Sequence, residues 1–274
     1  MHERAVLRID HPEPQQGMNG LHRIRPLLPM GQGGDRSLTD PFLGLMEDWF
    51  PRGVFDRHPH RGIETVTYVL EGELEHYDNQ GNSGVVRPGE AQWMTAGRGV
   101  IHNEIPAEGV TVHSLQLWVN LPAAKKMTAP RYQELTAETV PVRHEPGVEV
   151  RVFSGSSGNV RAPTLNHAPV TMLELRIDPA ATFRQELPPG DNAFLVILEG
   201  AGKVGGRAVN TGDVVFLERV EVASVVRLEG ALRALLFSGR PLNEPVVAYG
   251  PFVMNSMEQI REAFADYQAG RFGA

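Results

Sequence analysis

Three histidines and a carboxylate form two closely spaced pairs in this chain of 274 residues. His58 and His60 flank a single proline, which favours extended backbone at His58. In extended backbone, residues two apart point to the same side, so both imidazoles face one way. His102 and Glu104 have the same spacing. On neighbouring strands of a barrel, the two pairs would present three nitrogens and one carboxylate to a single point, which predicts a site for a divalent metal of intermediate hardness.

Strands separated by turns must position these pairs, because most of the chain has no helical period. The segment 63–70 is apolar and rich in β-branched residues, which is typical of a buried strand. The segment 110–119 alternates, so that Gln116 and Trp118 share one face of the expected strand. The 29 glycines and 21 prolines fit many short strands joined by tight turns.

An internal repeat divides the chain into two similar halves. The sequence YVLEG at 68–72 recurs as VILEG at 196–200, and PGE at 88–90 is matched by TGD at 211–213. In each half a strand ends in Leu-Glu-Gly, polar strands follow, and a turn leads into an apolar strand. The sequence therefore predicts two copies of one small β-barrel. At the positions of the second copy that match the three histidines, no histidine occurs, so we expect a metal in the first barrel only.

The joint between the two copies falls around 125–145, where lysines and prolines interrupt the strand pattern. We therefore expect an N-terminal metal-binding barrel over 1–135 and a C-terminal barrel without metal over 136–274. Both copies consist of strands and turns, so the expected fold class is all-β.

One helix is expected at the C-terminal end of the second segment. Apolar residues recur every three or four positions within 256–269. Ser256 and Gln259 have the spacing of a capping box, and Gly270 suits the end of a helix. An amphipathic helix of this kind usually covers one face of a core.

Composition excludes several classes of protein. The chain has no cysteine, which rules out disulfides, zinc fingers, iron–sulfur clusters and cysteine nucleophiles. Its net charge is −7, and it has no long basic block, which argues against direct binding of nucleic acid. The charged start MHERAVLRID does not fit a signal peptide, and no apolar run approaches the roughly 20 residues that span a bilayer. We expect a cytoplasmic protein that does not enter the membrane.

Four long segments of the chain resemble the pirin family: HPHRGIETVTYVLEGELEHYDNQGNSG, RPGEAQWMTAGRGVIHNE, LQLWVNLP and PLNEPVVAYGPFVMN. The resemblance extends from about residue 40 to 273. It implies a bicupin, in which two cupin β-barrels follow head to tail, with one mononuclear metal in the N-terminal barrel. By the motifs HPHRG and GRGxxHxE, the implied ligands are His58, His60, His102 and Glu104. The implied metal is Fe(II), although Ni, Zn, Mn or Cu can occupy such a donor set in a purified sample.

Other groups in the first barrel could compete for the metal. Glu64 occupies the position of the ligand glutamate in the general cupin pattern, but in pirins the ligand is the later glutamate. We therefore expect Glu64 to form a buried hydrogen bond beside the site. His76 lies close to a turn, and His113 falls on the strand face opposite Gln116, so neither is expected to touch the metal.

Three residues are candidates for the wall of a substrate pocket, namely Phe55, Met94 and Gln116. Phe55 precedes the first histidine by three residues, and Met94 lies on a strand that leads into a Thr-Ala-Gly turn. For Met94 the alternative is an ordinary position in the barrel core. Gln116 is the stronger candidate, because an inward-facing amide in a β-barrel needs a polar partner or water.

The resemblance implies two different kinds of function. Several bacterial pirin-like proteins are similar to quercetin 2,3-dioxygenases, which implies a flavonol-like aromatic substrate, dioxygen, and Glu104 as the general base. The alternative is a non-enzymatic, redox-responsive regulator that acts through a protein partner, transcriptional or metabolic. A measurement of oxygen consumption with quercetin would distinguish the two.

Overall fold

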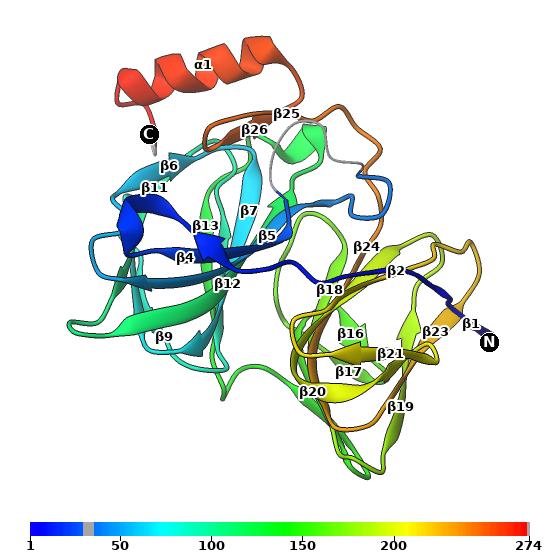
Figure 1. Ribbon diagram of the computed structural model, residues 1–274. Coiled ribbons are helices and arrows are strands. Elements are labelled where there is room, and N and C mark those ends of the chain that lie inside the picture. Colours follow the sequence, from blue (N-terminus) through cyan, green and yellow to red (C-terminus); the bar gives the residue numbers. More distant parts are fainter. Residues whose placement is uncertain (30–35, 273–274) are drawn as a thin grey trace. The chain divides into compact units, whose positions relative to one another are not determined.

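The computed structural model describes residues 1–29 and 36–272, and these form two compact units (Figure 1). The first unit contains residues 13–29, 42–137 and 242–272, and the second contains 1–12, 36–41 and 138–241. Almost all regular structure is β-strand, which confirms the all-β prediction. Among the residues that the structure describes, no helix has both the length and the apolar character needed to cross a membrane.

The first unit is built from two curled antiparallel sheets. Its larger sheet has the order β13-β10-β7-β12-β5-β4-β3, and its smaller sheet has the order β6-β11-β8-β9. The strands of the larger sheet are β3 (Gln15–Gln16), β4 (Arg23–Leu28), β5 (Phe42–Pro51), β7 (Ile63–Glu71), β10 (Ala91–Thr95), β12 (Thr111–Asn120) and β13 (Arg131–Leu135). Those of the smaller sheet are β6 (His58–His60), β8 (Leu74–Asp78), β9 (Ser83–Val86) and β11 (Val100–Pro106).

The second unit centres on one large sheet with the main order β1-β23-β20-β24-β18-β15-β14. Strand β2 pairs with β22, which itself pairs with β20, and β19 and β21 extend the sheet further. The strands are β1 (His2–Glu3), β2 (Val6–Asp10), β14 (Val142–Glu145), β15 (Val148–Ser154), β18 (Val170–Ile177), β19 (Thr182–Leu187), β20 (Asn192–Val204), β21 (Arg207–Asn210), β22 (Val214–Leu217), β23 (Ser224–Glu229) and β24 (Leu232–Gly239). A short separate ribbon consists of β16 (Ser156–Ser157) and β17 (Val160–Arg161).

The internal repeat of the sequence is a repeat of strand pairing. In the first unit β7 lies between β10 and β12, and in the second unit β20 lies between β22 and β24. The repeated sequence YVLEG lies at the end of β7, with Gly72 just beyond the strand, and VILEG lies within β20. The strand next to β10 is β13, whereas the strand next to β22 is β2 from the N-terminal end of the chain.

The terminal segments differ from the contiguous ranges expected from the sequence. Residues 1–12 belong to the second unit, because β2 pairs along the edge of β22. Residues 242–272 belong to the first unit, where Val253 donates its N–H to the carbonyl of Arg61. The expected ranges 1–135 and 136–274 follow the order of the chain, whereas in the two compact units the end segments are exchanged. The physical reason is that a strand edge can be paired by any segment that reaches it.

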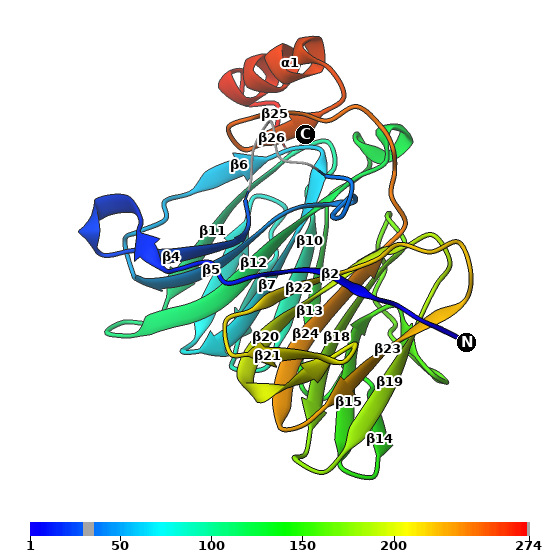
Figure 2. The ribbon, with the colours of Figure 1, turned by 45° about the vertical axis from the view of Figure 1, so that its right-hand side comes forward.

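The end segment of the first unit forms the hairpin of β25 (Val247–Tyr249) and β26 (Phe252–Met254), followed by α1 (Met257–Gln268). Both ribbon views show α1 beside this hairpin (Figures 1 and 2). Ile260 and Ala263 of the helix pack in one apolar cluster with β26. The side chain of Ser256 accepts a hydrogen bond from the backbone N–H of Gln259, so the predicted helix and its cap are confirmed.

A glycine permits the hairpin to approach the barrel closely. Gly62 has φ +81°, a conformation that side chains with a Cβ rarely adopt. A Cβ at this position would lie 1.9 Å from the carbonyl oxygen of Val253, so no larger residue fits. The buried ammonium of Lys126 then donates to the carbonyls of both Gly62 and Val253. This junction fixes the end segment next to β6.

The interiors of the two units differ in chemistry at matching positions. In the second unit, a row of apolar side chains crosses β22, β20 and β24 and lies in the core: Val215, Leu195 and Leu236. The repeat places polar residues at the same positions of the first unit: Gln92, Thr67 and Gln116. One barrel is thus filled with hydrocarbon, and the other has a polar interior on which a site can be built.

Candidate metal centre

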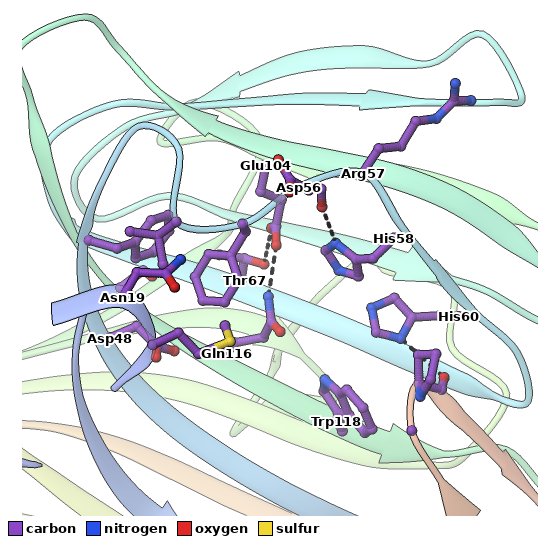
Figure 3. Close-up of a pocket in the computed structure, with 17 residues that line it drawn as sticks. Asn19, Asp48, Asp56, Arg57, His58, His60, Thr67, Glu104, Gln116 and Trp118 are labelled. Carbon is purple, nitrogen blue, oxygen red and sulfur yellow. Dashed lines mark hydrogen bonds between the residues drawn. The ribbon is translucent and has the colours of Figure 1, made fainter. Parts of the chain in front are cut away.

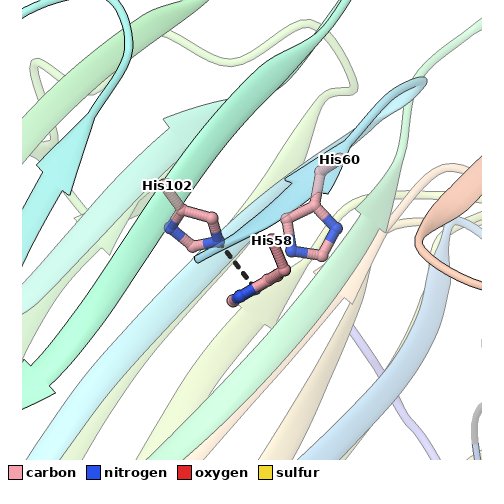
Figure 4. Close-up of side chains that lie close together, drawn as sticks. All are labelled: His58, His60 and His102. Atoms are coloured by element: carbon pink, nitrogen blue, oxygen red, sulfur yellow. Dashed lines mark hydrogen bonds between the residues drawn. The ribbon is translucent and has the colours of Figure 1, made fainter. Parts of the chain in front are cut away.

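The three predicted histidines come together in the first unit. Strands β6 and β11 pair antiparallel, with His58 directly opposite His102. The Nε2 atoms of these two rings are 3.0 Å apart. The ring of His60 lies 4.9 Å from that of His58 and 5.1 Å from that of His102, measured between centroids. One nitrogen of each ring lies within 4.8 Å of the others, a spacing that could hold a metal ion (Figure 4).

Hydrogen bonds to backbone carbonyls determine which nitrogen of two rings is available. Nδ1 of His58 is 2.8 Å from the carbonyl oxygen of Asp56, and Nδ1 of His60 is 3.3 Å from that of Pro251. A carbonyl only accepts, so both Nδ1 atoms carry the proton and both Nε2 atoms present a lone pair. Nε2 of His60 is buried and has no hydrogen-bond partner in the described part of the chain. This donor set fits a metal ion.

Burial keeps the imidazoles of His60 and His102 neutral. Loss of solvent, and then the neighbouring His58, lower the pKa of His60 to about 3. Burial also lowers the pKa of His102 well below its usual value, with further contributions from the rings of His60, His58 and His76. Neutral imidazole is the form that binds a metal, so the rings need not lose a proton first.

Glu104 lies at the polar centre of the barrel rather than within the histidine group. Its carboxylate accepts hydrogen bonds from Thr67 Oγ1 at 2.6 Å, Gln92 Nε2 at 2.5 Å and Gln116 Nε2 at 2.8 Å. A second group of donors within 4.8 Å of one another contains Glu104, His102 and His76. The four expected ligands are therefore divided between two groups that share His102.

His76 lies closer to this centre than the sequence suggested. It is fully buried, its ring stacks on Tyr132 at 4.3 Å, and its centroid is 5.4 Å from that of His102. Burial lowers the pKa of His76, while the charges of Glu104 and Asp78 oppose this effect. Its position two residues after the buried Leu74 places it on the inward face of β8. That alternation is the signal that could have identified it.

The other competing groups have separate partners. Glu64 is buried and accepts a hydrogen bond from Thr95 Oγ1 at 2.7 Å, and it belongs to neither donor group. His113 lies on the opposite face of β12 from Gln116, as expected. Its Nε2 is 2.7 Å from Glu47, and its ring stacks on Trp49 at 4.4 Å.

A cavity of about 690 Å³ opens beside the histidines. His58, His60 and Glu104 line it together with Phe55, Gln116 and Trp118 (Figure 3). Two of the three residues expected in a pocket wall, Phe55 and Gln116, line this cavity. The third, Met94, is not among the lining residues; its side chain is 1% exposed and packs in an apolar cluster with Ile63 and Val100. The register explains this, because Met94 lies opposite Thr65, one inward-facing position further along the barrel than the row at Thr67.

Comparisons with known proteins agree with this architecture. Residues 35–119 match the family model Pirin, and residues 172–273 match the Pirin C-terminal cupin domain. A pirin-like protein of Caulobacter vibrioides is 42% identical, over 98% of this chain and 99% of its own length. A crystal structure from Geobacillus kaustophilus is 48% identical, with a TM-score of 0.86, over 90% of this chain and 100% of that one.

A second crystal structure carries the name of an activity. It is described as quercetin 2,3-dioxygenase from Acinetobacter baumannii and is 31% identical, with a TM-score of 0.86, over 99% of both chains. The two family models, the relatives and the repeated strand pairing of the two units all indicate the same family. The chain belongs to the pirin family.

Proposed function

We propose that this chain is a mononuclear metal-dependent dioxygenase that acts on a flavonol-type aromatic. The observation that carries the proposal is the group of three converging imidazoles, two of them buried, beside a cavity of about 690 Å³. We propose that His58, His60, His102 and Glu104 together hold one ion, with Fe(II) as the native metal. The name of the related Acinetobacter structure supports the choice of reaction.

The cavity wall suits a flat aromatic ligand. Phe50 and Phe55 contact each other edge to face at 4.8 Å, and Trp118 contributes an indole on another side. Aromatic side chains bind such ligands through area burial and ring contacts and exclude water from the site. His58, His60 and Glu104 give the wall a polar part at the metal centre, so the ligand would be oriented with a polar edge toward the histidines.

Glu104 is suited to accept the proton of the ligand's 3-hydroxyl. Its carboxylate lines the cavity, and the three hydrogen bonds from Thr67, Gln92 and Gln116 fix its orientation. A general base needs this combination of reach and fixed geometry. A bound Fe(II) would supply Lewis acidity and the electron chemistry that a reaction with dioxygen requires. In the overall reaction, one flavonol and one dioxygen give a ring-opened ester and one carbon monoxide.

Oxygen consumption by iron-reconstituted protein tests this proposal. The protein is purified without chelating resins, analysed for metals, loaded with Fe(II), and supplied with quercetin in an oxygen electrode while carbon monoxide is measured in parallel. Stoichiometric oxygen uptake and carbon monoxide release, absent in His102→Ala, are expected. Turnover no faster than with free iron would overturn the enzyme proposal and favour the regulator that acts through a protein partner.

A further inference from the structure

The cavity contains a second ionisable pair that the proposed chemistry does not use. Asp48 of β5 lines the cavity, and Nε2 of His22, just before β4, donates to its Oδ1 at 2.7 Å. The side chains of Asp48 and His22 are only 9% and 3% exposed. Figure 3 shows Asp48 near Asn19 on one side of the pocket and His58 and His60 on the other, with Gln116 between them.

The local structure fixes His22 tightly. Its ring contacts Phe55 edge to face at 5.2 Å, and its carbonyl accepts the backbone N–H of Gly17 at 2.8 Å. A Cβ at Gly17 would lie 2.4 Å from Nδ1 of His22, so only glycine allows the ring to occupy this place. A side chain enclosed in this way acts as a fixed support for the carboxylate that it touches.

Asp48 lines the cavity, and only one of its two carboxylate oxygens, Oδ1, contacts His22. Apart from the contact with His22, no hydrogen bond to this side chain arises from residues 1–29 and 36–272. Its surroundings in the wall include the apolar Phe50, Val54 and Phe55. Burial raises the pKa of Asp48; the hydrogen bond from His22 opposes this, and the charges of Glu104 and Glu47 add to it. An acceptor in such a wall is satisfied best by a donor on the ligand.

We propose that Asp48 is a specificity-determining residue of this pocket. Its carboxylate accepts a hydrogen bond from a hydroxyl that the aromatic ligand carries on the side remote from the histidines. The inference rests on the proposed function for the class of ligand but not for the reaction. A ligand without this hydroxyl cannot form the hydrogen bond to the carboxylate, so its affinity should be about tenfold lower or more.

Binding of three flavonols to metal-free protein tests the inference. Quercetin has two hydroxyls on its phenyl ring, kaempferol has one, and galangin has none. Quenching of tryptophan fluorescence reports binding, because Trp118 lies in the cavity wall. We expect the unaltered protein to bind quercetin and kaempferol at least tenfold more tightly than galangin.

Asp48→Asn is the informative variant. Its amide oxygen can still accept from His22, while its NH₂ group presents a donor to the ligand in place of an acceptor. The preference for hydroxylated ligands should then fall close to one. Glu108→Gln is the control, because Glu108 is an exposed carboxylate of the same unit that is not part of the cavity wall, and its removal should leave the preference unchanged.

The outcomes separate this inference from the proposed reaction. Equal affinities for the three flavonols, or an unchanged preference in Asp48→Asn, would overturn the role of Asp48 even if iron-loaded protein consumes oxygen. A preference that depends on Asp48, without oxygen consumption by loaded protein, would support the inference and overturn the dioxygenase. Binding of none of the three would overturn both.

Discussion

Nε2 of His58 faces Nε2 of His102 at 3.0 Å. The proton of His58 is on Nδ1, which donates to the carbonyl of Asp56, so its Nε2 presents a lone pair to the other ring. Two imidazoles that bind one ion at about 2.1 Å and at right angles have their nitrogens about 3.0 Å apart. The protein therefore holds these rings at the spacing of metal ligands, and the fold itself supplies this arrangement through the pairing of β6 with β11.

His102→Ala should abolish metal binding without unfolding the chain. Nδ1 of His102 has no hydrogen-bond partner among the described residues, and Nε2 contacts the ring of His58, so removal of the ring breaks few hydrogen bonds. The metal content measured by elemental analysis should fall from one ion per chain to none, with an unchanged far-UV circular dichroism spectrum. Retention of one ion would show that the metal lies elsewhere, for example in the second unit. His113→Ala, a histidine on the outer face of β12, is the control and should keep the ion.

Glu104→Gln should weaken metal binding and eliminate flavonol turnover. Three imidazoles remain for the ion, but the carboxylate that would take the substrate proton is lost. Thr67 and Gln92 donate to one oxygen of Glu104 and Gln116 donates to the other, so the NH₂ group of the amide must face at least one donor, which we expect to cost about 1–3 kcal/mol of unfolding free energy. Titration with Fe(II) and oxygen consumption would be measured on the same preparation. Unimpaired turnover would rule out Glu104 as the base.

The local periodicity of the sequence was sufficient for much of this site. The two-residue spacing in an extended segment places His58 and His60 on one side, and the alternation of 110–119 directs Gln116 inward. Strand alternation is a property of backbone geometry, so it can be read without knowledge of tertiary contacts. The helix at the C-terminal end follows from periodicity and capping for the same reason.

Contacts between distant segments could not be predicted in this way. The pair of Asp48 and His22 joins positions 26 apart, and no local pattern relates them. The pairing of β2 with β22 likewise depends on which segment reaches a free strand edge in space. The position of Met94 in an apolar cluster could not be predicted either, because a strand buried on both faces gives no alternation to distinguish pocket from core.

Lys126→Met should destabilise the first unit. The ammonium of Lys126 is buried and donates to Gly62 O at 2.8 Å, Asn120 Oδ1 at 2.6 Å and Val253 O at 2.9 Å. Methionine fills a similar volume but leaves these acceptors without their donor, which we expect to cost about 2–4 kcal/mol. Chemical denaturation followed by tryptophan fluorescence would measure it, because Trp49, Trp93 and Trp118 all lie in this unit.

The neighbouring lysine provides the control for this variant. Lys125 is exposed, so Lys125→Met removes the same charge and should change the unfolding free energy by no more than about 0.5 kcal/mol. Equal losses of unfolding free energy in the two variants would show that the stability depends on the charge. The buried hydrogen bonds that fix the end segment would then not determine it.

Asp191→Asn should change the pH dependence of stability in the second unit. Burial raises the pKa of Asp191 to about 6, although the guanidinium groups of Arg240 and Arg4 and a hydrogen bond from Ser238 oppose the shift. The folded state therefore binds this proton at a pH where the unfolded state, with a pKa of about 3.9, has lost it. Below about pH 4 this difference in proton binding stabilises the folded state by about 2–3 kcal/mol, and the stabilisation is lost as the pH rises through 6.

The asparagine variant lacks this titration and keeps a neutral side chain at every pH. Its stability relative to the unaltered chain should therefore increase between pH 4 and pH 7. Denaturation followed by far-UV circular dichroism is the suitable measurement, because the second unit contains no tryptophan. Asp178→Asn replaces an exposed carboxylate of the same unit and serves as the control. The difference in unfolding free energy between Asp191→Asn and the unaltered chain could instead stay constant from pH 4 to pH 7. That result would show that folding does not disfavour the charged carboxylate of Asp191.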